Sequence, residues 1–178
     1  VPSKTLLRSA RMASYANRAR EFGLELPAPT VDFAAVMERV QATIRQIEPH
    51  DSEERFRSLG AEVIRGRARI VSPWEVEVDG RRLRSRRIVI ATGARARVPA
   101  VPGLEDLEVL TSDNLWELRE CPRRLLVLGG GPIGCELSQG LARLGAEVTV
   151  VNKGPRLMPR DDGDAAELVT AALRADGV

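Results

Sequence analysis

The sequence is poor in aromatic residues, which make up 3% of its 178 residues, and it contains one histidine and two cysteines. So few rings exclude the stacking platforms with which many single-stranded nucleic-acid binders hold bases. Cys121 and Cys135 belong to no C-x-x-C or His-rich pattern, so we expect neither a metal site nor a thioredoxin-type redox pair. His50 lies in the polar connection PHDSEER and is expected to be a surface residue.

Long apolar runs and a large net charge are also absent. No stretch approaches the roughly 18 apolar residues that suggest a membrane-spanning helix. Lys and Arg total 27 against 25 Asp and Glu, and the resulting net charge of +2 gives no broad field to attract nucleic acid or an anionic membrane. We therefore expect a soluble, cytoplasmic globular protein with no membrane and no nucleic-acid partner.

A β-hairpin is the clearest local signal in the first half of the chain. Residues 74–78, WEVEV, alternate strictly and meet Asp79-Gly80, a strong turn signal, before RRLRSRR returns. The arginines of this return could form a nucleic-acid patch. However, alternation would put them on both faces of the ribbon and no aromatic residue lies among them, so we interpret the segment as a solvated hairpin. The following run, IVIATG, predicts a buried strand.

The phrase LGAEV occurs at residues 59–63 and again at 144–148, each time between a helical pattern and a β-branched run. A glycine just past the last helical turn closes a helix in the left-handed conformation, and the apolar run that follows predicts a strand. Helices are expected over residues 3–21 and 32–47. A short helix to Leu59, with Asp51 and Glu54 at capping-box spacing, should lead into the strand AEVIRG.

The last residues, LRADGV, repeat the same phrase, with Gly177 as the closing glycine. Val178 then falls where a buried strand is expected to begin. We accordingly expect the C-terminus to be cut within a domain.

The motif that is most informative about function is rich in glycine. The strand LLVL at 125–128 runs into GGGPIG, a predicted helix to Leu144 and a second strand, VTVV, which is the context that the G-x-G-x-x-G motif requires. Gly129 is expected to permit the tight turn, Gly131 to let the backbone approach a pyrophosphate, and Gly134 to let the helix pack on the strand. Pro132 and Ile133 open the helix, whose free N–H groups should point at a bound anion.

The end of the second strand bears on which dinucleotide is bound. An NAD-preferring unit usually places Asp or Glu there, and this sequence has Asn152, followed by Lys153 and then Arg156. A carboxylate would repel a 2′-phosphate, whereas Lys153 or Arg156 could pair with it, which favours NADP over NAD. The alternative is that Asn152 binds the ribose hydroxyl of NAD while the basic residues face water.

The order of motifs resembles the FAD-dependent pyridine nucleotide-disulfide oxidoreductases, most closely the mercuric reductase and dihydrolipoamide dehydrogenase branch. VPSK at the start of the chain is similar to the residues that follow the second redox cysteine in that family. RRIVIATGARARVPAVPG at 86–103 resembles the end of the flavin domain and the crossover into the nicotinamide domain. The resemblance covers essentially the whole chain.

This resemblance implies an α/β fold made of parts of two doubly wound, Rossmann-like domains that bind FAD and NAD(P), with a β-hairpin insertion. Residues 1–100 would be the C-terminal portion of the FAD-binding domain. Residues 101–120 would form the crossover, and residues 121–178 the N-terminal portion of the NAD(P)-binding domain.

The resemblance also assigns cofactor-binding roles. Lys4 matches the lysine near the flavin, and Glu136 the glutamate that pairs with it. Ala68 matches the position whose backbone meets the adenine of FAD, and the flavin-contacting turn falls on Ala91, Thr92 and Gly93. A buried lysine needs a partner, and a carboxylate is favoured near a helix N-terminus, so the Lys4–Glu136 pair is physically reasonable.

The family's first glycine motif, its redox cysteines and its C-terminal dimerisation domain with the acid-base histidine have no counterpart here, so no catalytic residue is assigned. The resemblance implies an enzyme, part of a homodimeric flavoprotein of redox homeostasis that passes a hydride from NAD(P)H to FAD and on to a disulfide/thiol centre, and that acts on a disulfide or metal-ion substrate. The alternative is a catalytically incompetent nucleotide-binding or structural fragment.

Overall fold

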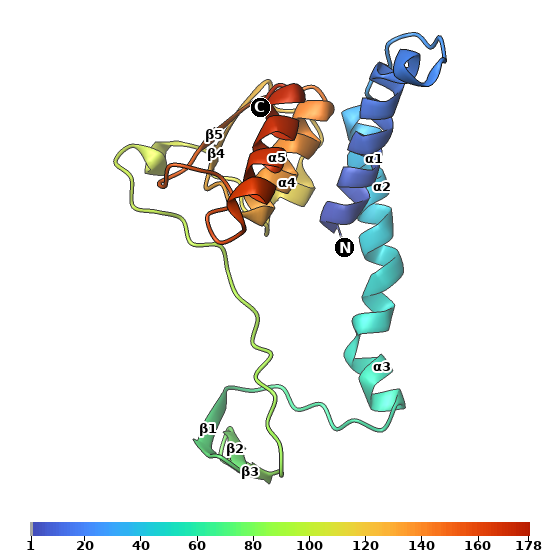
Figure 1. Cartoon of the computed structure of the whole chain (residues 1–178). Helices are drawn as coiled ribbons and strands as arrows, with labels where there is room; N and C mark the ends of the chain where they lie inside the picture. The colour runs from blue at the N-terminus through green and yellow to red at the C-terminus, as the bar shows by residue number, and fades with distance from the viewer. Residues whose placement is uncertain (1) are drawn as a thin grey trace. The chain divides into compact units, whose positions relative to one another are not determined.

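The computed structural model describes residues 2–178 (Figure 1). The chain divides into two compact units. One contains the residues up to Ile44 together with Asn114–Val178, and the other is Arg45–Asp113. No helix among the described residues is both long and apolar enough to cross a membrane.

The two predicted N-terminal helices are confirmed. They form α1 (Pro2–Asn17), continued by the 3-10 helix η1 (Ala19–Phe22), and α2 (Phe33–Ile47). Asp32 caps α2, because its carboxylate accepts the Ala35 N–H at 2.9 Å. Arg39 of α2 donates to the Thr5 carbonyl of α1 at 2.9 Å, which ties the two helices together.

The glycine motif lies in a βαβ unit, as predicted. Strand β4 (Arg124–Leu128) leads into α4 (Pro132–Arg143) and then β5 (Glu147–Val151), which pairs parallel with β4 in the register Leu126↔Thr149. Helix α5 (Gly163–Ala175) follows, and the 3-10 helix η4 (Leu115–Glu117) precedes the strand.

Helix α1 packs against α4, and the side chains between the elements of this unit form its core. Leu6 and Val40 are 0% exposed and Leu141 is 1% exposed. Burial of each such side chain contributes about 1.5–3 kcal/mol.

All three occurrences of the repeated phrase close a helix in the same way. Gly60, Gly145 and Gly177 have φ of 88°, 112° and 86°. In each case the glycine N–H bonds three residues back and the next N–H bonds five residues back, as for Ala146 to the Leu141 carbonyl at 3.0 Å. This pair of bonds defines the Schellman motif, so the helix ends predicted from LGAEV and LRADGV are confirmed.

The second unit holds an antiparallel sheet in the order β1-β2-β3. Its strands are β1 (Ala68–Ser72), β2 (Glu75–Val78) and β3 (Arg81–Arg84), and its helices are η2 (Glu48–Asp51), α3 (Glu53–Ser58) and η3 (Leu104–Asp106). The predicted hairpin is confirmed, with Asp79 and Gly80 both at positive φ in its turn. The predicted capping by Asp51 is wrong, because Ser52 is the N-cap and its hydroxyl accepts the Arg55 N–H at 3.2 Å.

Two predicted strands are also corrected. AEVIRG (61–66) and IVIATG (88–93) are irregular, and Val89 and Ile90 are 86% and 69% exposed. An apolar run becomes a buried strand only when a neighbouring strand takes its N–H and C=O groups. Within residues 2–178 no strand pairs with either segment.

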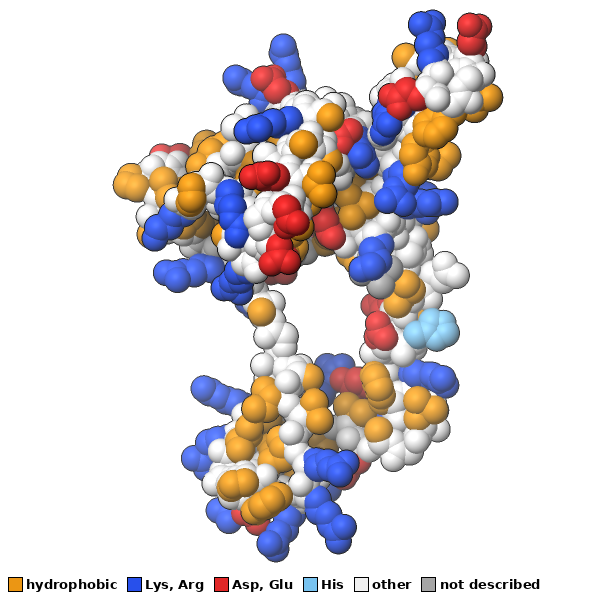
Figure 2. All heavy atoms as spheres, viewed as in Figure 1, with side chains coloured by type: hydrophobic (Ala, Val, Ile, Leu, Met, Phe, Trp, Pro, Cys, Tyr) orange, Lys and Arg blue, Asp and Glu red, His pale blue; other side chains and the backbone are white. Residues whose placement is uncertain are grey.

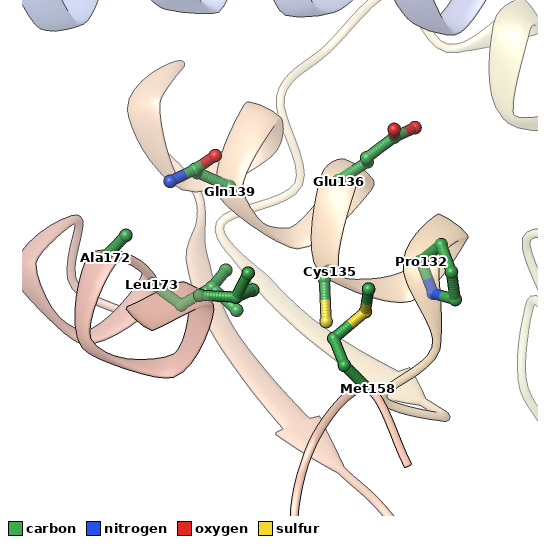
Figure 3. A pocket seen from close by; sticks show the side chains of 8 residues that line it. Pro132, Cys135, Glu136, Gln139, Met158, Ala172 and Leu173 are labelled. Carbon is green, nitrogen blue, oxygen red and sulfur yellow. The ribbon is translucent and has the colours of Figure 1, made fainter. Parts of the chain in front are cut away.

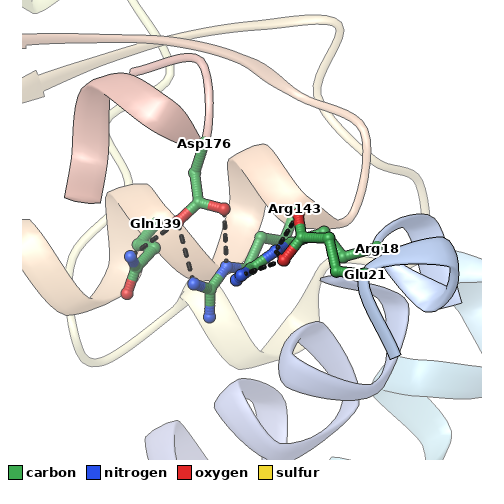
Figure 4. Close-up of polar contacts among 5 residues, drawn as sticks. All are labelled: Arg18, Glu21, Gln139, Arg143 and Asp176. Carbon is green, nitrogen blue, oxygen red and sulfur yellow. Dashed lines mark hydrogen bonds and ion pairs between the residues drawn. The ribbon is translucent and has the colours of Figure 1, made fainter. Parts of the chain in front are cut away.

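A polar network joins the end of α5 to α4 (Figure 4). The Asp176 carboxylate accepts hydrogen bonds from Arg143 Nε at 3.0 Å, Arg143 Nη2 at 2.8 Å and Gln139 Nε2 at 2.7 Å. The side chains of Arg143 and Asp176 are only 21% and 17% exposed, so solvent screens this forked pair less than a surface ion pair. Figure 4 also shows the exposed ion pair Arg18–Glu21.

We predict that Asp176→Ala lowers the free energy of unfolding by about 2 kcal/mol, because it leaves the partly buried guanidinium of Arg143 and the amide of Gln139 without their acceptor. Thermal unfolding followed by circular dichroism measures the change. The matched control is Glu167→Ala, an exposed carboxylate on α5 for which the described residues show no ion pair, and it should change the value by less than about 0.5 kcal/mol. Equal effects of the two substitutions would contradict the proposed role of Asp176.

Candidate functional site

The turn between β4 and α4 is held to the end of β5. Gly129 has φ 114°, a conformation that favours glycine, and its N–H donates to the Val151 carbonyl at 2.8 Å, which continues the parallel ladder by one bond. The Gly130 N–H donates to Asn152 Oδ1 at 3.1 Å, and the Gly130 carbonyl accepts from the Met158 N–H at 2.7 Å. The turn therefore has a fixed shape before any ligand arrives.

Gly131 and Gly134 have opposite surroundings. A Cβ on Gly134 would overlap the carbonyl oxygen of Gly129, so the helix can start this close to the turn only with glycine there. A Cβ on Gly131 would meet nothing within 4 Å. The open space beside the Gly131 backbone is the feature that a closely approaching phosphate requires.

The N-terminus of α4 offers hydrogen-bond donors to that space. Pro132 is the first helical residue, and no side chain among residues 2–178 caps the helix. For the N–H groups of Ile133 and Gly134, the described part of the chain supplies no acceptor, and Ile133 is 68% exposed. Uncapped N–H groups and the positive end of the helix dipole together form an anion-binding site, so the residues here fit the pyrophosphate of a dinucleotide.

The loop after β5 is organised by two of the residues proposed to select the dinucleotide. Besides accepting from Gly130, the Asn152 side chain donates from Nδ2 to the carbonyls of Gly154 at 3.2 Å and Arg156 at 2.7 Å. The Arg156 guanidinium donates to three further loop carbonyls, those of Met158, Pro159 and Asp161. Lys153 is exposed, and no ion pair or hydrogen bond of its side chain is recorded in residues 2–178.

A hollow of about 300 Å³ lies between α4, α5 and this loop (Figure 3). It is lined by Pro132, Cys135, Glu136, Gln139, Met158, Val169, Ala172 and Leu173. Burial raises the pKa of the Cys135 thiol, so the group stays protonated, and its S–H donates to the Gly130 carbonyl of the turn at 3.6 Å. No sequence pattern points to Met158 or the α5 residues, because their place depends on the packing of α5.

The residues assigned to the flavin are not gathered into one site that the structure describes. Ala68 begins β1, and Ala91, Thr92 and Gly93 form an exposed irregular segment of the 45–113 unit. Lys4 and Glu136 lie in the other unit, on α1 and α4. These assignments remain predictions.

Helices α1 and α4 approach closely, and a Cβ on Gly140 would lie 3.0 Å from Leu7 Cδ2. Lys4 and Glu136 each lie one turn before these contact residues, and both are exposed. Among residues 2–178 the structure records no ion pair between them. The pairing of Lys4 with Glu136 therefore also remains a prediction.

A parallel βαβ unit with this turn defines an α/β protein of the dinucleotide-binding class. The family model of the pyridine nucleotide-disulphide oxidoreductases matches residues 1–178, and the chain belongs to this family. The predicted family and the predicted Rossmann-like fold class are thus confirmed.

Several relatives match the whole chain. A mercuric reductase from Bacillus cereus is 36% identical over 178 residues, which cover 100% of this chain and 28% of the reductase. A dihydrolipoyl dehydrogenase from Bacillus subtilis (strain 168) is 32% identical over 185 residues, with coverage of 100% and 40%. The chain therefore spans well under half the length of these relatives.

Solved structures also match the whole chain. The Cu(II) complex of the HOCl-induced flavoprotein disulfide reductase RclA from Escherichia coli matches with a TM-score of 0.74 at 27% identity, over 100% of this chain and 37% of that one. LpdA from Mycobacterium tuberculosis matches with a TM-score of 0.73 at 28% identity, over 100% and 40%.

The two glycines give a paired prediction about stability. Gly134→Ala should lower the free energy of unfolding by about 2 kcal/mol, because its methyl group overlaps backbone that cannot move away without displacing α4. Gly131→Ser should change it by less than about 0.5 kcal/mol, because the site is open, φ is −81° and serine is a favoured N-cap residue. Thermal unfolding measures both values. Equal destabilisation would contradict the different roles assigned to the two glycines.

Proposed function

We propose that the chain is part of a flavoprotein oxidoreductase that passes a hydride from NAD(P)H to FAD and on to a disulfide/thiol centre, whose disulfide is reduced to a pair of thiols. The observation that carries this proposal is the glycine turn, where open space beside Gly131 meets the uncapped N–H groups of Ile133 and Gly134. Membership of the family supports FAD and NAD(P)H as the cofactors. The final substrate would be a small disulfide or a metal ion such as the mercuric ion, as the relatives' names suggest.

Within this function the residues of the chain bind and orient. When bound, the dinucleotide would supply the hydride chemistry and the flavin would transfer the electrons. The start of α4 would hold the pyrophosphate through the N–H groups of Ile133 and Gly134, and Gly131 would allow its close approach. The fixed shape of the turn means that little order has to be created on binding, which favours affinity.

The flavin side of the proposal rests on resemblance. Lys4 would lie near the flavin with Glu136 as its partner, Ala68 would meet the adenine, and Ala91, Thr92 and Gly93 would contact the cofactor. We propose that the complete enzyme is a cytoplasmic homodimer. The competing proposal is that this polypeptide binds a nucleotide but does not turn over, because residues 1–178 hold no assigned catalytic group.

We propose NADP as the dinucleotide, with Lys153 as the residue that recognises its 2′-phosphate. Of the three candidates, Asn152 and Arg156 already bond to backbone groups of the loop, whereas the ammonium group of Lys153 stands exposed at the end of β5. Asn152 and Arg156 would then act by shaping the loop that presents Lys153.

The first test is NADPH binding to the 178-residue chain by isothermal titration calorimetry. We expect saturable binding that Gly131→Ser weakens about tenfold, because the introduced hydroxyl accepts the N–H bonds that a phosphate would take. Unchanged thermal unfolding of the variant shows that the fold is intact. Absence of NADPH binding, or equal binding by the variant, would refute the proposed site.

The second test separates the roles in the loop. Lys153→Ala should weaken NADPH binding about fivefold and leave NADH binding unchanged, because one exposed ion pair contributes up to about 1 kcal/mol. Arg156→Ala should weaken both cofactors alike, because it loosens the loop. Arg160→Ala, which removes an exposed charge nearby in the same loop, is the control and should alter neither affinity. A loss of NADH affinity in Lys153→Ala would show that the residue does not read the 2′-phosphate.

A further inference from the structure

The segment 65–97 is strongly basic although the chain as a whole is nearly neutral. It contains ten arginines and three acidic residues, hence a net charge of +7, against +2 for all 178 residues. The basic side chains stand out around the β1–β3 sheet in Figure 2. Such a concentration of one sign attracts anionic partners and orients their approach.

Ion pairs within the unit neutralise only some of these arginines. Arg69 and Arg82 share Glu77, at 3.0 and 3.4 Å, and Arg81 pairs with Glu62 at 2.6 Å. The hydrogen bond from Arg69 is the main cause that lowers the pKa of Glu77. For the side chains of Arg84 and Arg86 no ion pair is recorded in residues 2–178, so their guanidinium groups remain available.

These two arginines lie beside an exposed indole. Trp74 is 55% exposed, and with Arg84, Ser85 and Arg86 it lines an open hollow of about 440 Å³. The backbone around the hollow is fixed, since the Ser85 N–H donates to the Trp74 carbonyl at 2.9 Å. The Ser85 hydroxyl in turn accepts the Arg87 N–H at 3.3 Å and donates to the Arg87 carbonyl at 2.9 Å.

The hollow lies at the end of strand β3, because Arg84, the last residue of that strand, is part of its lining. In the order β1-β2-β3 the strand β3 pairs on one side only, so within residues 2–178 one row of its N–H and C=O groups has no strand partner. An edge lined with arginine repels other basic chains and discourages random pairing. The same charges attract an acidic strand, whose carboxylates match the guanidinium fork.

We propose that the β3 edge together with the hollow at Trp74 binds an extended, acidic polypeptide segment. Backbone groups of the segment would pair with β3, carboxylates would bond to Arg84 and Arg86, and an apolar side chain would cover the indole. A polypeptide fits better than a nucleic acid, because Trp74 is the one aromatic residue in segment 65–97 and successive bases need several stacking surfaces. The surface lies outside the glycine turn and does not depend on the proposed dinucleotide site.

The chain contains a built-in probe for this proposal, because its two tryptophans are Trp74 and Trp116. In a Trp116→Phe background the emission reports Trp74 alone. The ligand is a short synthetic peptide of alternating Glu and Val with blocked ends. We expect a saturable blue shift on titration, because an apolar side chain removes water from the indole. Arg84→Gln with Arg86→Gln should weaken binding at least tenfold, roughly 1.4 kcal/mol.

Matched controls distinguish a specific peptide-binding site from nonspecific electrostatic attraction. Arg55→Gln removes an exposed arginine of α3 in the same unit and should leave the affinity unchanged. A Gln-Val peptide should not bind, and oligo(dT) should bind more weakly than the acidic peptide. Equal losses in Arg55→Gln, or tighter binding of oligo(dT), would overturn the proposal, as would the absence of a saturable shift. Far-UV circular dichroism confirms that each variant is folded.

Discussion

The close approach of α4 to the glycine turn is the constraint on which the rest of the first unit depends. Gly134 lies so near the Gly129 carbonyl that no side chain fits between them. This contact fixes where α4 begins, and so it aims the uncapped N–H groups of the helix at the open side of the turn. The same placement brings the other face of α4 against α1 and its end to Asp176. A small shift at Gly134 would therefore disturb the anion site and the packing together.

A second constraint comes from polar groups that hold the loop after β5 against the turn. Asn152 satisfies the Gly130 N–H and two loop carbonyls, and Arg156 satisfies three more carbonyls. The Gly130–Asn152 bond is partly buried and the other bonds are exposed, so together they act mainly by holding this irregular backbone in one conformation. Two side chains with the chemistry to bind a ribose or a phosphate are thus used to shape the loop. Of the three candidates, Lys153 is the one for whose side chain no bond is recorded within residues 2–178, which supports its proposed role.

The sequence allowed the local features to be predicted well. Helix ends at Gly60, Gly145 and Gly177, the hairpin turn at Asp79-Gly80 and the βαβ context of the glycine motif all depend on a few neighbouring residues with distinct conformational preferences. The roles of Asn152 and Arg156 could not be predicted, since the decisive contact of Asn152 is with Gly130, 22 positions earlier. A residue type shows which bonds a side chain can make, whereas the fold decides which groups are within reach.

Two apolar runs of similar composition show that composition alone does not decide whether a strand forms. RLLVL at 124–128 becomes a strand because β5 returns alongside it after one helix, so that every bond of the parallel ladder has a partner close in sequence. IVIATG at 88–93 has the composition of a buried strand, yet it forms no strand, since no strand within the described residues pairs with it, and Val89 and Ile90 are exposed. Strand propensity measures how well a residue fits a pleated, half-buried surface, and it takes effect only when a second strand provides that surface. The difference between the two runs therefore arises from topology, because only the first has its partner within a single βαβ unit.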